Sequence, residues 1–267
     1  MSDAKTGAGL PVVLLHALPL DSAMWDGPAR ALRARGHRVL PIDQRGFGGT
    51  PLPADAAPSL DLVADDLARA LDRRGLGSAL VAGCSMGGYT AMSFLRRHPH
   101  RVRALALFAA RSAADTPKQA AARLRFADLI TDDSLRAGIV ADTTPSLLGA
   151  TTRARRPRLL DRVTALARAA DPRSVAWAQR AIAARGDSLA ALSATDVPAV
   201  VVRGEEDELV SPDEARESAA ALPHGRLVTL PGVGHLAPLE APGKTVEILT
   251  ALLAAAQAAR PTGATAC

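Results

Sequence analysis

A serine flanked by glycines is the residue of this chain best placed to do chemistry. Ser85 stands in a G-x-S-x-G motif at residues 83–87, after the apolar run 79–82 and before a helical pattern. A strand–turn–helix setting of this kind is the one in which such a serine serves as a nucleophile. Small residues two positions before and after it let strand and helix pack closely. A glycine-rich turn with an incidental serine is the alternative interpretation, and the setting disfavours it.

A serine hydroxyl needs a base to take its proton and an acid to orient that base. His235 is the only histidine after the last apolar run, 226–230, and four adjacent acids at 205–208 follow the run 198–202. Both loops leave the carboxyl ends of expected strands, at the same sheet edge as Ser85, in the chain order serine, acid, histidine. We therefore predict His235 as the base, with a solvated surface histidine as the alternative. The spacing alone does not select one of the four acids.

Short apolar runs predict the strands that must position these groups. Runs that are apolar throughout are typical of parallel strands buried on both faces. They lie at 12–15, 37–43, 79–83, 104–108, 198–202 and 226–230. Helical patterns separate them at 24–35, 59–74, 86–97, 212–222 and 242–259. This alternation predicts an α/β fold with a mostly parallel, doubly wound sheet flanked by helices.

The alternation stops between residues 111 and 192. Four helical patterns fill this stretch without a strand-like run, at 116–130, 134–141, 157–170 and 172–185. We predict a core of residues 1–110 and 193–267, with residues 111–192 inserted as an all-helical lid. Such lids supply walls that exclude water from a site.

The composition narrows the classes of partner. Hydrophobic residues make up 48% of the 267 residues, which is ordinary for a globular protein. Aromatic residues make up only 3% and the formal net charge is +5, so nucleic acid is not an expected partner. No signal peptide or apolar run of ~18 residues occurs, so we expect a cytoplasmic protein without a membrane partner. No metal-ligand spacing or dinucleotide motif occurs either, and we predict no metal and no cofactor.

Further motifs give the chain a resemblance to a known superfamily. LHALP at 15–19, with Trp25, resembles the oxyanion loop of the α/β-hydrolase superfamily, and DQRGFGGT at 43–50 resembles its Asp-x-Arg-Gly-x-Gly-x-Ser loop. GEEDELVSP at 204–212 resembles its acid loop and GH at 234–235 its base loop. Ala17 and Thr50 depart from the usual Gly and Ser. The resemblance covers nearly the whole chain and points to the branch with a helical lid.

The resemblance implies a role for each site residue. It makes Ser85, Asp207 and His235 the catalytic residues, and it makes the backbone N–H groups of Leu18 and Met86 the oxyanion hole. The SMGG run of this chain, at 85–88, is similar to the corresponding runs of 3-oxoadipate enol-lactonases, carboxylesterases, carbon–carbon hydrolases and perhydrolases. The expected function is hydrolysis of small-molecule esters or lactones through an acyl-enzyme. Carbon–carbon hydrolysis, perhydrolysis, a thioesterase or cyclase step, and a non-catalytic ligand receptor are the alternatives.

The substrate pocket is the least determined part of the site. We assign Trp25 and Trp177 to its walls, with a simple core position as an equal alternative for Trp25. Residues 111–192 carry 14 Lys and Arg against 8 Asp, including arginines at positions 153, 155, 156, 158 and 162. The rest of the chain is close to neutral. This contrast leads to the hypothesis that the lid favours anionic substrates.

Overall fold

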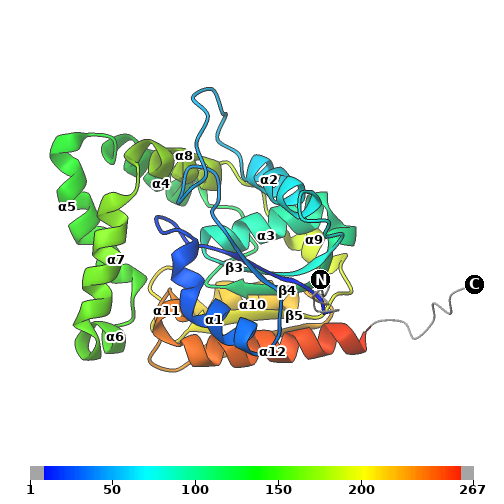
Figure 1. Ribbon diagram of the computed structural model, residues 1–267. Helices are drawn as coiled ribbons and strands as arrows, with labels where there is room; N and C mark the ends of the chain where they lie inside the picture. The colour runs from blue at the N-terminus through cyan, green and yellow to red at the C-terminus, as the bar shows by residue number, and fades with distance from the viewer. Residues whose placement is uncertain (1–8, 260–267) are drawn as a thin grey trace, which may run out of the picture.

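The structure, a computed structural model, describes residues 9–259. Its centre is a parallel sheet with helices around it (Figure 1). The sheet has six strands in the order β2-β1-β3-β4-β5-β6. The strands are β1 (Val12–Leu15), β2 (Val39–Ile42), β3 (Ala79–Cys84), β4 (Val102–Phe108), β5 (Ala199–Gly204) and β6 (Gly225–Leu230). Each lies at one of the predicted apolar runs. The predicted fold class is confirmed.

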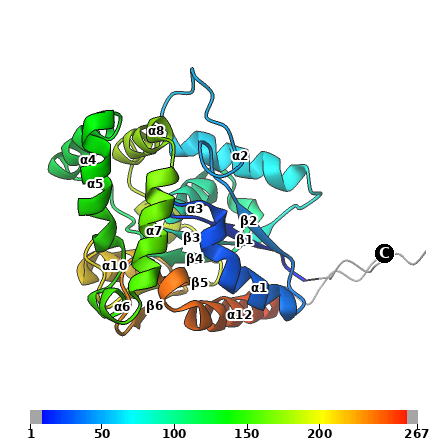
Figure 2. The ribbon, with the colours of Figure 1, turned by 60° about the vertical axis from the view of Figure 1, so that its left-hand side comes forward.

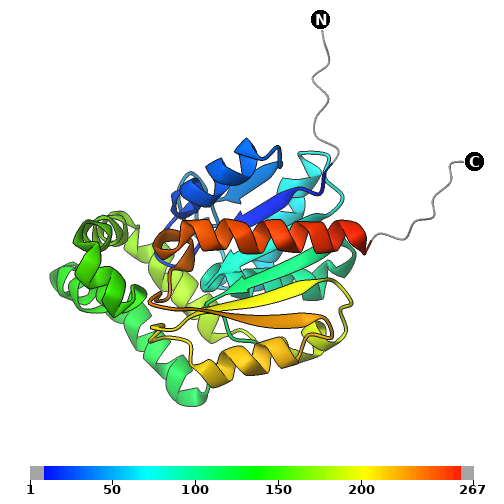
Figure 3. The same ribbon diagram turned by 90° about the horizontal axis from the view of Figure 1, so that it is seen from below.

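Helices cover both faces of the sheet. One face carries α1 (Asp26–Ala34) and α12 (Pro242–Ala258), and Figure 3 shows α12, in red, lying across the strands. The other face carries α2 (Leu60–Asp72), α3 (Met86–Arg97) and α10 (Pro212–Ala220). Short elements complete this body: η1 (Ser22–Trp25), η2 (Pro99–Arg101) and α11 (Ala237–Glu240).

The core explains why the inner strands are apolar at every position. In β1, Val12 and Leu14 pack toward α1 and α12, whereas Val13 and Leu15 pack toward α2 and α3. Side chains alternate across a strand, so a strand covered on both faces buries all of them. β6, at the edge of the sheet, is only partly buried.

A helical insert lies between β4 and β5, and Figure 2 brings it to the front of the sheet. Its helices are α4 (Pro117–Leu129), α5 (Asp133–Thr143), η3 (Thr144–Leu147), α6 (Ala150–Arg155), α7 (Pro157–Ala169), α8 (Pro172–Ala183) and α9 (Leu189–Ser193). The four predicted helical patterns match α4, α5, α7 and α8. None of the helices within residues 9–259 combines the length and apolar character needed to cross a bilayer.

Local signals set where the insert helices begin. Thr116 and Gln119 form a capping box at α4, and Asp171 caps α8. Proline occupies the first turn of α4, α7 and α8, where its missing N–H costs nothing. No sequence pattern predicted α6, a helix of six residues without a side-chain cap. Its start is held instead by Glu206 in the loop after β5 and by Glu240 in α11.

Candidate active site

Ser85 occupies a strained turn between β3 and α3. Its φ of 52° and ψ of −115° are unusual for a residue with a Cβ and mark a backbone that its surroundings hold in place. The neighbouring glycines are needed for close approach, because a Cβ on Gly83 would lie 2.1 Å from the Gly87 carbonyl oxygen. The Ser85 N–H donates to Phe108 O at 2.8 Å. The turn therefore presents the serine at the carboxyl end of the sheet.

His235 is bonded to a buried carboxylate. Its Nδ1 lies 2.9 and 3.0 Å from the two oxygens of Asp207, whose side chain is fully buried. The backbone N–H groups of Leu209 and Val210 donate to the same carboxylate at 2.9 and 3.1 Å. Burial would raise the pKa of Asp207, but the charge and hydrogen bond of His235 and these two N–H donors outweigh it and lower the pKa. An ionised Asp207 accepts from Nδ1–H, which leaves Nε2 as the proton acceptor of the ring.

The four acids at 205–208 each contact a different partner. Glu205 accepts from Gly232 N–H at 3.1 Å, and Glu206 accepts from the N–H and hydroxyl of Thr151. Glu208 pairs with Arg153 at 3.2 Å. Asp207 is the member of the run that contacts His235.

Glu240, which no sequence motif singled out, holds the backbone around His235. Its Oε2 accepts from Gly234 N–H at 3.0 Å and from Gly149 N–H, in the insert, at 2.9 Å. Its Oε1 accepts from Leu236 N–H at 3.1 Å. The carboxylate thus ties both neighbours of His235 to the start of α6. The one sequence signal was a single acid in the stretch 233–242, which apart from His235 is otherwise apolar.

The loop after β1 approaches the serine from the other side. Leu18 lines the same cavity as Ser85. Within residues 9–259, the backbone N–H groups of Leu18 and Met86 donate to no protein acceptor. Ala17 does not have a positive φ, so its Cβ is tolerated where the superfamily has glycine. Two free N–H donors beside the serine could hold a developing oxyanion.

His16 braces this loop. Its Nε2 accepts from Gln44 N–H at 3.0 Å and its Nδ1 donates to Ala17 O at 3.1 Å. The Gln44 amide returns a hydrogen bond to His16 O at 2.7 Å. Burial lowers the pKa of His16 to about 4, so the ring is neutral at pH 7. These bonds and the neutral ring make His16 a brace of the loop rather than a second catalytic base.

Cys84 precedes the serine but faces away from the cavity lining. It is fully buried, and burial raises the pKa of its thiol well above the ordinary value. Its Sγ makes a weak contact with His235 O at 3.6 Å. A thiol in this state is not a nucleophile.

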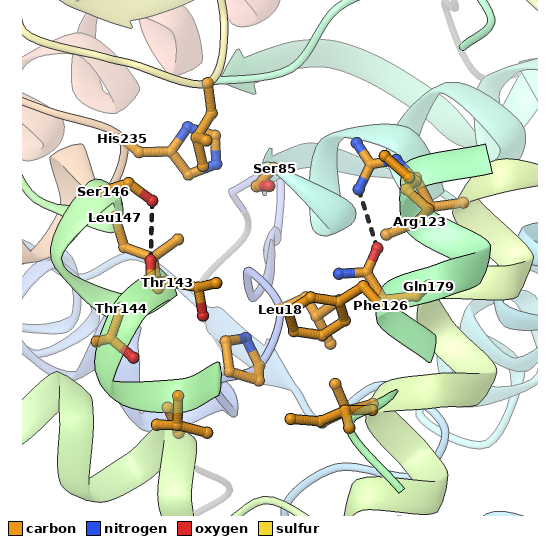
Figure 4. A pocket seen from close by; sticks show the side chains of 18 of the residues that line it. Leu18, Ser85, Arg123, Phe126, Thr143, Thr144, Ser146, Leu147, Gln179 and His235 are labelled. Atoms are coloured by element: carbon orange, nitrogen blue, oxygen red, sulfur yellow. Dashed lines mark hydrogen bonds between the residues drawn. The ribbon is translucent and has the colours of Figure 1, made fainter. Parts of the chain in front are cut away.

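A cavity of about 440 Å³ joins these groups. Ser85, His235 and Leu18 line it from the sheet, and apolar side chains line it from the insert: Phe126, Ile130, Val140, Ala167, Val175 and Ile182. Figure 4 shows Ser85 between His235 on one side and Arg123 with Gln179 on the other. A cavity of this size suits a small molecule.

The two tryptophans do not line this cavity, which corrects the pocket assignment. Trp25 is fully buried and packs edge-on against Phe108, with ring centroids 5.8 Å apart. Trp177 donates from Nε1 to Ala56 O at 2.7 Å. On α8 the residues that line the cavity are Pro172, Val175, Gln179 and Ile182, and Trp177 instead faces the loop before α2.

The position of the lid arginines is also corrected. None of the five arginines at 153, 155, 156, 158 and 162 lines the cavity. Arg153 donates to the carbonyls of Pro145 and Leu148, and Arg156 donates to those of Leu239 and Glu240. The arginines that do line the cavity are Arg111, Arg123 and Arg136.

Comparison with known proteins places the chain in a family. A family model described as alpha/beta hydrolase fold matches residues 11–242. The chain belongs to the α/β-hydrolase fold family. This α/β hydrolase is similar to a thermophilic esterase from Thermogutta terrifontis, solved with malate bound, at 32% identity and a TM-score of 0.87 over 94% of this chain and 92% of that one. It is also similar to the enol-lactonase from Burkholderia xenovorans LB400, at 25% identity and a TM-score of 0.83 over 94% of each chain.

Similarity to curated relatives is confined to a shorter stretch. AB hydrolase superfamily protein YisY of Bacillus subtilis is 35% identical over 92 residues, which is 34% of each chain. The 2-hydroxymuconate semialdehyde hydrolase of a Pseudomonas strain is 34% identical over 104 residues, 38% of this chain and 37% of that protein. The matched stretch thus spans about a third of the length of these relatives. This α/β hydrolase is related to esterases and lactonases, and its relatives do not define one substrate.

Proposed function

We propose that this protein is a serine hydrolase that cleaves carboxylic esters or lactones of small molecules. The observation that carries the proposal is the arrangement of three side chains. A buried, ionised Asp207 orients His235, and His235 lines the same cavity as Ser85 at its strained turn. This is the order of acid, base and nucleophile that activates a serine hydroxyl. The similarity to an esterase and an enol-lactonase supports the choice of esters and lactones.

The mechanism follows from the roles of these groups. Ser85 Oγ attacks the substrate carbonyl carbon while His235 Nε2 takes the hydroxyl proton. The carbonyl oxygen becomes an oxyanion held by the N–H groups of Leu18 and Met86, each worth roughly 2.7–4 kcal/mol by analogy with a comparable donor. The imidazolium then gives its proton to the leaving alkoxide, and the acyl group stays on Ser85. His235 next takes a proton from water, whose attack releases the acid and restores the serine.

The direct test is turnover of an activated ester. Ser85→Ala should lower kcat on p-nitrophenyl acetate by at least about 10⁴-fold, because the nucleophile is lost while the fold is kept. Ser146→Ala is the matched control, because Ser146 also lines the cavity but its hydroxyl donates to Thr143 O and has no acid–base partner. It should keep kcat within a few-fold. A Ser85→Ala enzyme with near-normal turnover would rule out the proposed mechanism.

A further inference from the structure

Three arginines converge on one buried carboxylate beside the cavity. Asp115, whose side chain is fully buried, contacts Arg123 at 2.6 Å, Arg185 at 3.0 Å and also Arg111. Burial would raise the pKa of Asp115, but the charges of Arg123 and Arg185 outweigh it, so the carboxylate is ionised. Glu214 adds a second carboxylate, 3.0 Å from Arg111. Arginine keeps its charge in proteins, so three positive charges face two negative ones.

Arg111 leaves part of its hydrogen-bonding capacity unused. Its side chain is only 6% exposed, and its Nε has no hydrogen-bond partner among residues 9–259. Its other nitrogens are occupied by Asp115 and Glu214. A buried N–H without an acceptor destabilises the folded protein, and the cost is larger on a charged group. Such a group needs an explanation, and a bound anion supplies one.

Arg111 and Arg123 both line the cavity, together with Gln179. Arg123 Nη1 donates to Gln179 Oε1 at 3.0 Å, which fixes the guanidinium of α4 against the amide of α8. Figure 4 shows this pair across the cavity from His235, with Ser85 between them. A substrate bound at Ser85 can therefore extend toward Arg123 within the same cavity, whose lining also includes the apolar side chains of Phe126 and Ile182.

Nearby charges do not change this balance. The guanidinium of Arg185 lies 4.1 Å from the centroid of the Tyr89 ring. Its Nη1 contacts Ile182 O and Asp115, and its Nη2 donates to Ala113 O. Arg136 also lines the cavity, but it pairs with the exposed Asp133 on its own helix. Glu208, a carboxylate in the cavity lining, pairs with Arg153 at 3.2 Å. With these pairs balanced, the excess positive charge lies in the cluster of Arg111, Arg123 and Arg185, and Arg111 and Arg123 are its members that line the cavity.

We propose that Arg111, Arg123 and Gln179 form a subsite for a carboxylate on the substrate. The ligand class is an ester or lactone that carries a carboxylate at the far end of a short apolar spacer. One carboxylate charge matches the single excess positive charge of the cluster, and a planar guanidinium suits a carboxylate acceptor. This inference rests on the proposed hydrolase activity, because it names the substrate class of the same cavity.

The test compares a matched pair of esters. The first is the mono-4-nitrophenyl ester of adipic acid, with a free carboxylate, and the second is the same ester with that carboxylate capped as a methyl ester. At low salt the protein should show a kcat/KM at least tenfold higher for the free acid. Arg123→Gln should lower that ratio about tenfold. Gln179→Glu places a negative charge in the subsite, which repels the carboxylate of the free acid. It should lower the ratio below one, and it replaces Arg123→Gln as the test if that variant does not fold.

Arg158→Gln is the control, because Arg158 is an exposed arginine of the insert that does not line the cavity. It should leave both rates and their ratio unchanged. Equal kcat/KM for the two esters at low salt would overturn the subsite while leaving the hydrolase activity intact. Loss of the preference in Arg158→Gln but not in Arg123→Gln would overturn it too. Failure of the protein to cleave either ester would instead overturn the proposed hydrolase activity, and the subsite with it.

Discussion

The two walls of the cavity are built in different ways. On the sheet side, α3 buries ten of its twelve residues, Ser85 N–H donates to Phe108 O, and buried carboxylates hold His235 and its loop. On the insert side, α4 buries only Ala127 of its thirteen residues, and Arg123 is fixed by side-chain pairs with Asp115 and Gln179. The reacting groups therefore stand in a closely packed frame, whereas Arg123, which meets the rest of the substrate in the proposed subsite, stands on a helix with little buried surface.

The two walls are joined at the start of α6. Glu206, from the acid loop, accepts from Thr151 N–H at 2.8 Å, and Glu240, beside the base loop, accepts from Gly149 N–H at 2.9 Å. A Cβ on Gly149 would lie 2.5 Å from Glu206 Oε2 and 2.8 Å from Gly234 N, so the segments are in close contact. A movement of the insert at the start of α6 would therefore displace both the acid loop and the base loop.

The largest effect should come from the carboxylate on the sheet side. Asp207→Asn should lower kcat on p-nitrophenyl acetate by about 10⁴-fold, because an amide no longer holds His235 in the tautomer with Nε2 free. Glu205→Gln, an exposed acid of the same run, should keep kcat within a few-fold. Steady-state kinetics of both variants decide the matter. Comparable losses in the two would mean that the loop, and not Asp207, matters.

The brace under the Leu18 loop should make stability depend on pH. The pKa of His16 is about 4 in the folded protein against an ordinary 6.5, so the unfolded chain binds the proton first as the pH falls. The contribution of neutral His16 to the free energy of unfolding is fully present above about pH 6.5. It is lost as the pH falls from 6.5 to 4, by up to about 3 kcal/mol in all. Urea unfolding at several pH values measures the slope.

Two variants isolate this contribution from the rest of the chain. His16→Asn should flatten the pH dependence of the free energy of unfolding in that window, whatever its effect at pH 7. His224→Asn removes an exposed histidine and should leave the slope as it is. An unchanged slope in His16→Asn would show that another group carries the pH dependence.

A smaller effect should come from the carboxylate at the joint of the two walls. Glu240→Gln leaves one acceptor oxygen for three backbone N–H groups, so the free energy of unfolding should fall by about 2 kcal/mol. We expect kcat to fall and KM to stay nearly constant, because the loop of His235 loosens while the pocket walls remain. Glu247→Gln breaks only an exposed pair with Lys244 and should change neither value. A change in KM alone would place Glu240 with the insert wall instead.

The same contrast decides what the sequence could predict. Strands such as β1 and β3 were predictable because burial on both faces leaves a continuous apolar run, and Ser85 was predictable because its turn demands glycines. Asp207 needed the resemblance, since four adjacent acids look alike until the turn after β5 sends them apart. Trp177 was misplaced because the phase of α8 against the sheet is a tertiary property. Glu240 was missed because its partners are backbone N–H groups, which leave no mark in the sequence.

The central claim is that His235, held by Asp207, makes the Ser85 hydroxyl a nucleophile. Labelling with a fluorophosphonate, followed by peptide mass spectrometry, tests it most directly. The account predicts a single phosphonyl adduct on the peptide containing Ser85, formed within minutes and lost in His235→Ala. No adduct on Ser85, or one that forms equally fast in His235→Ala, would contradict it.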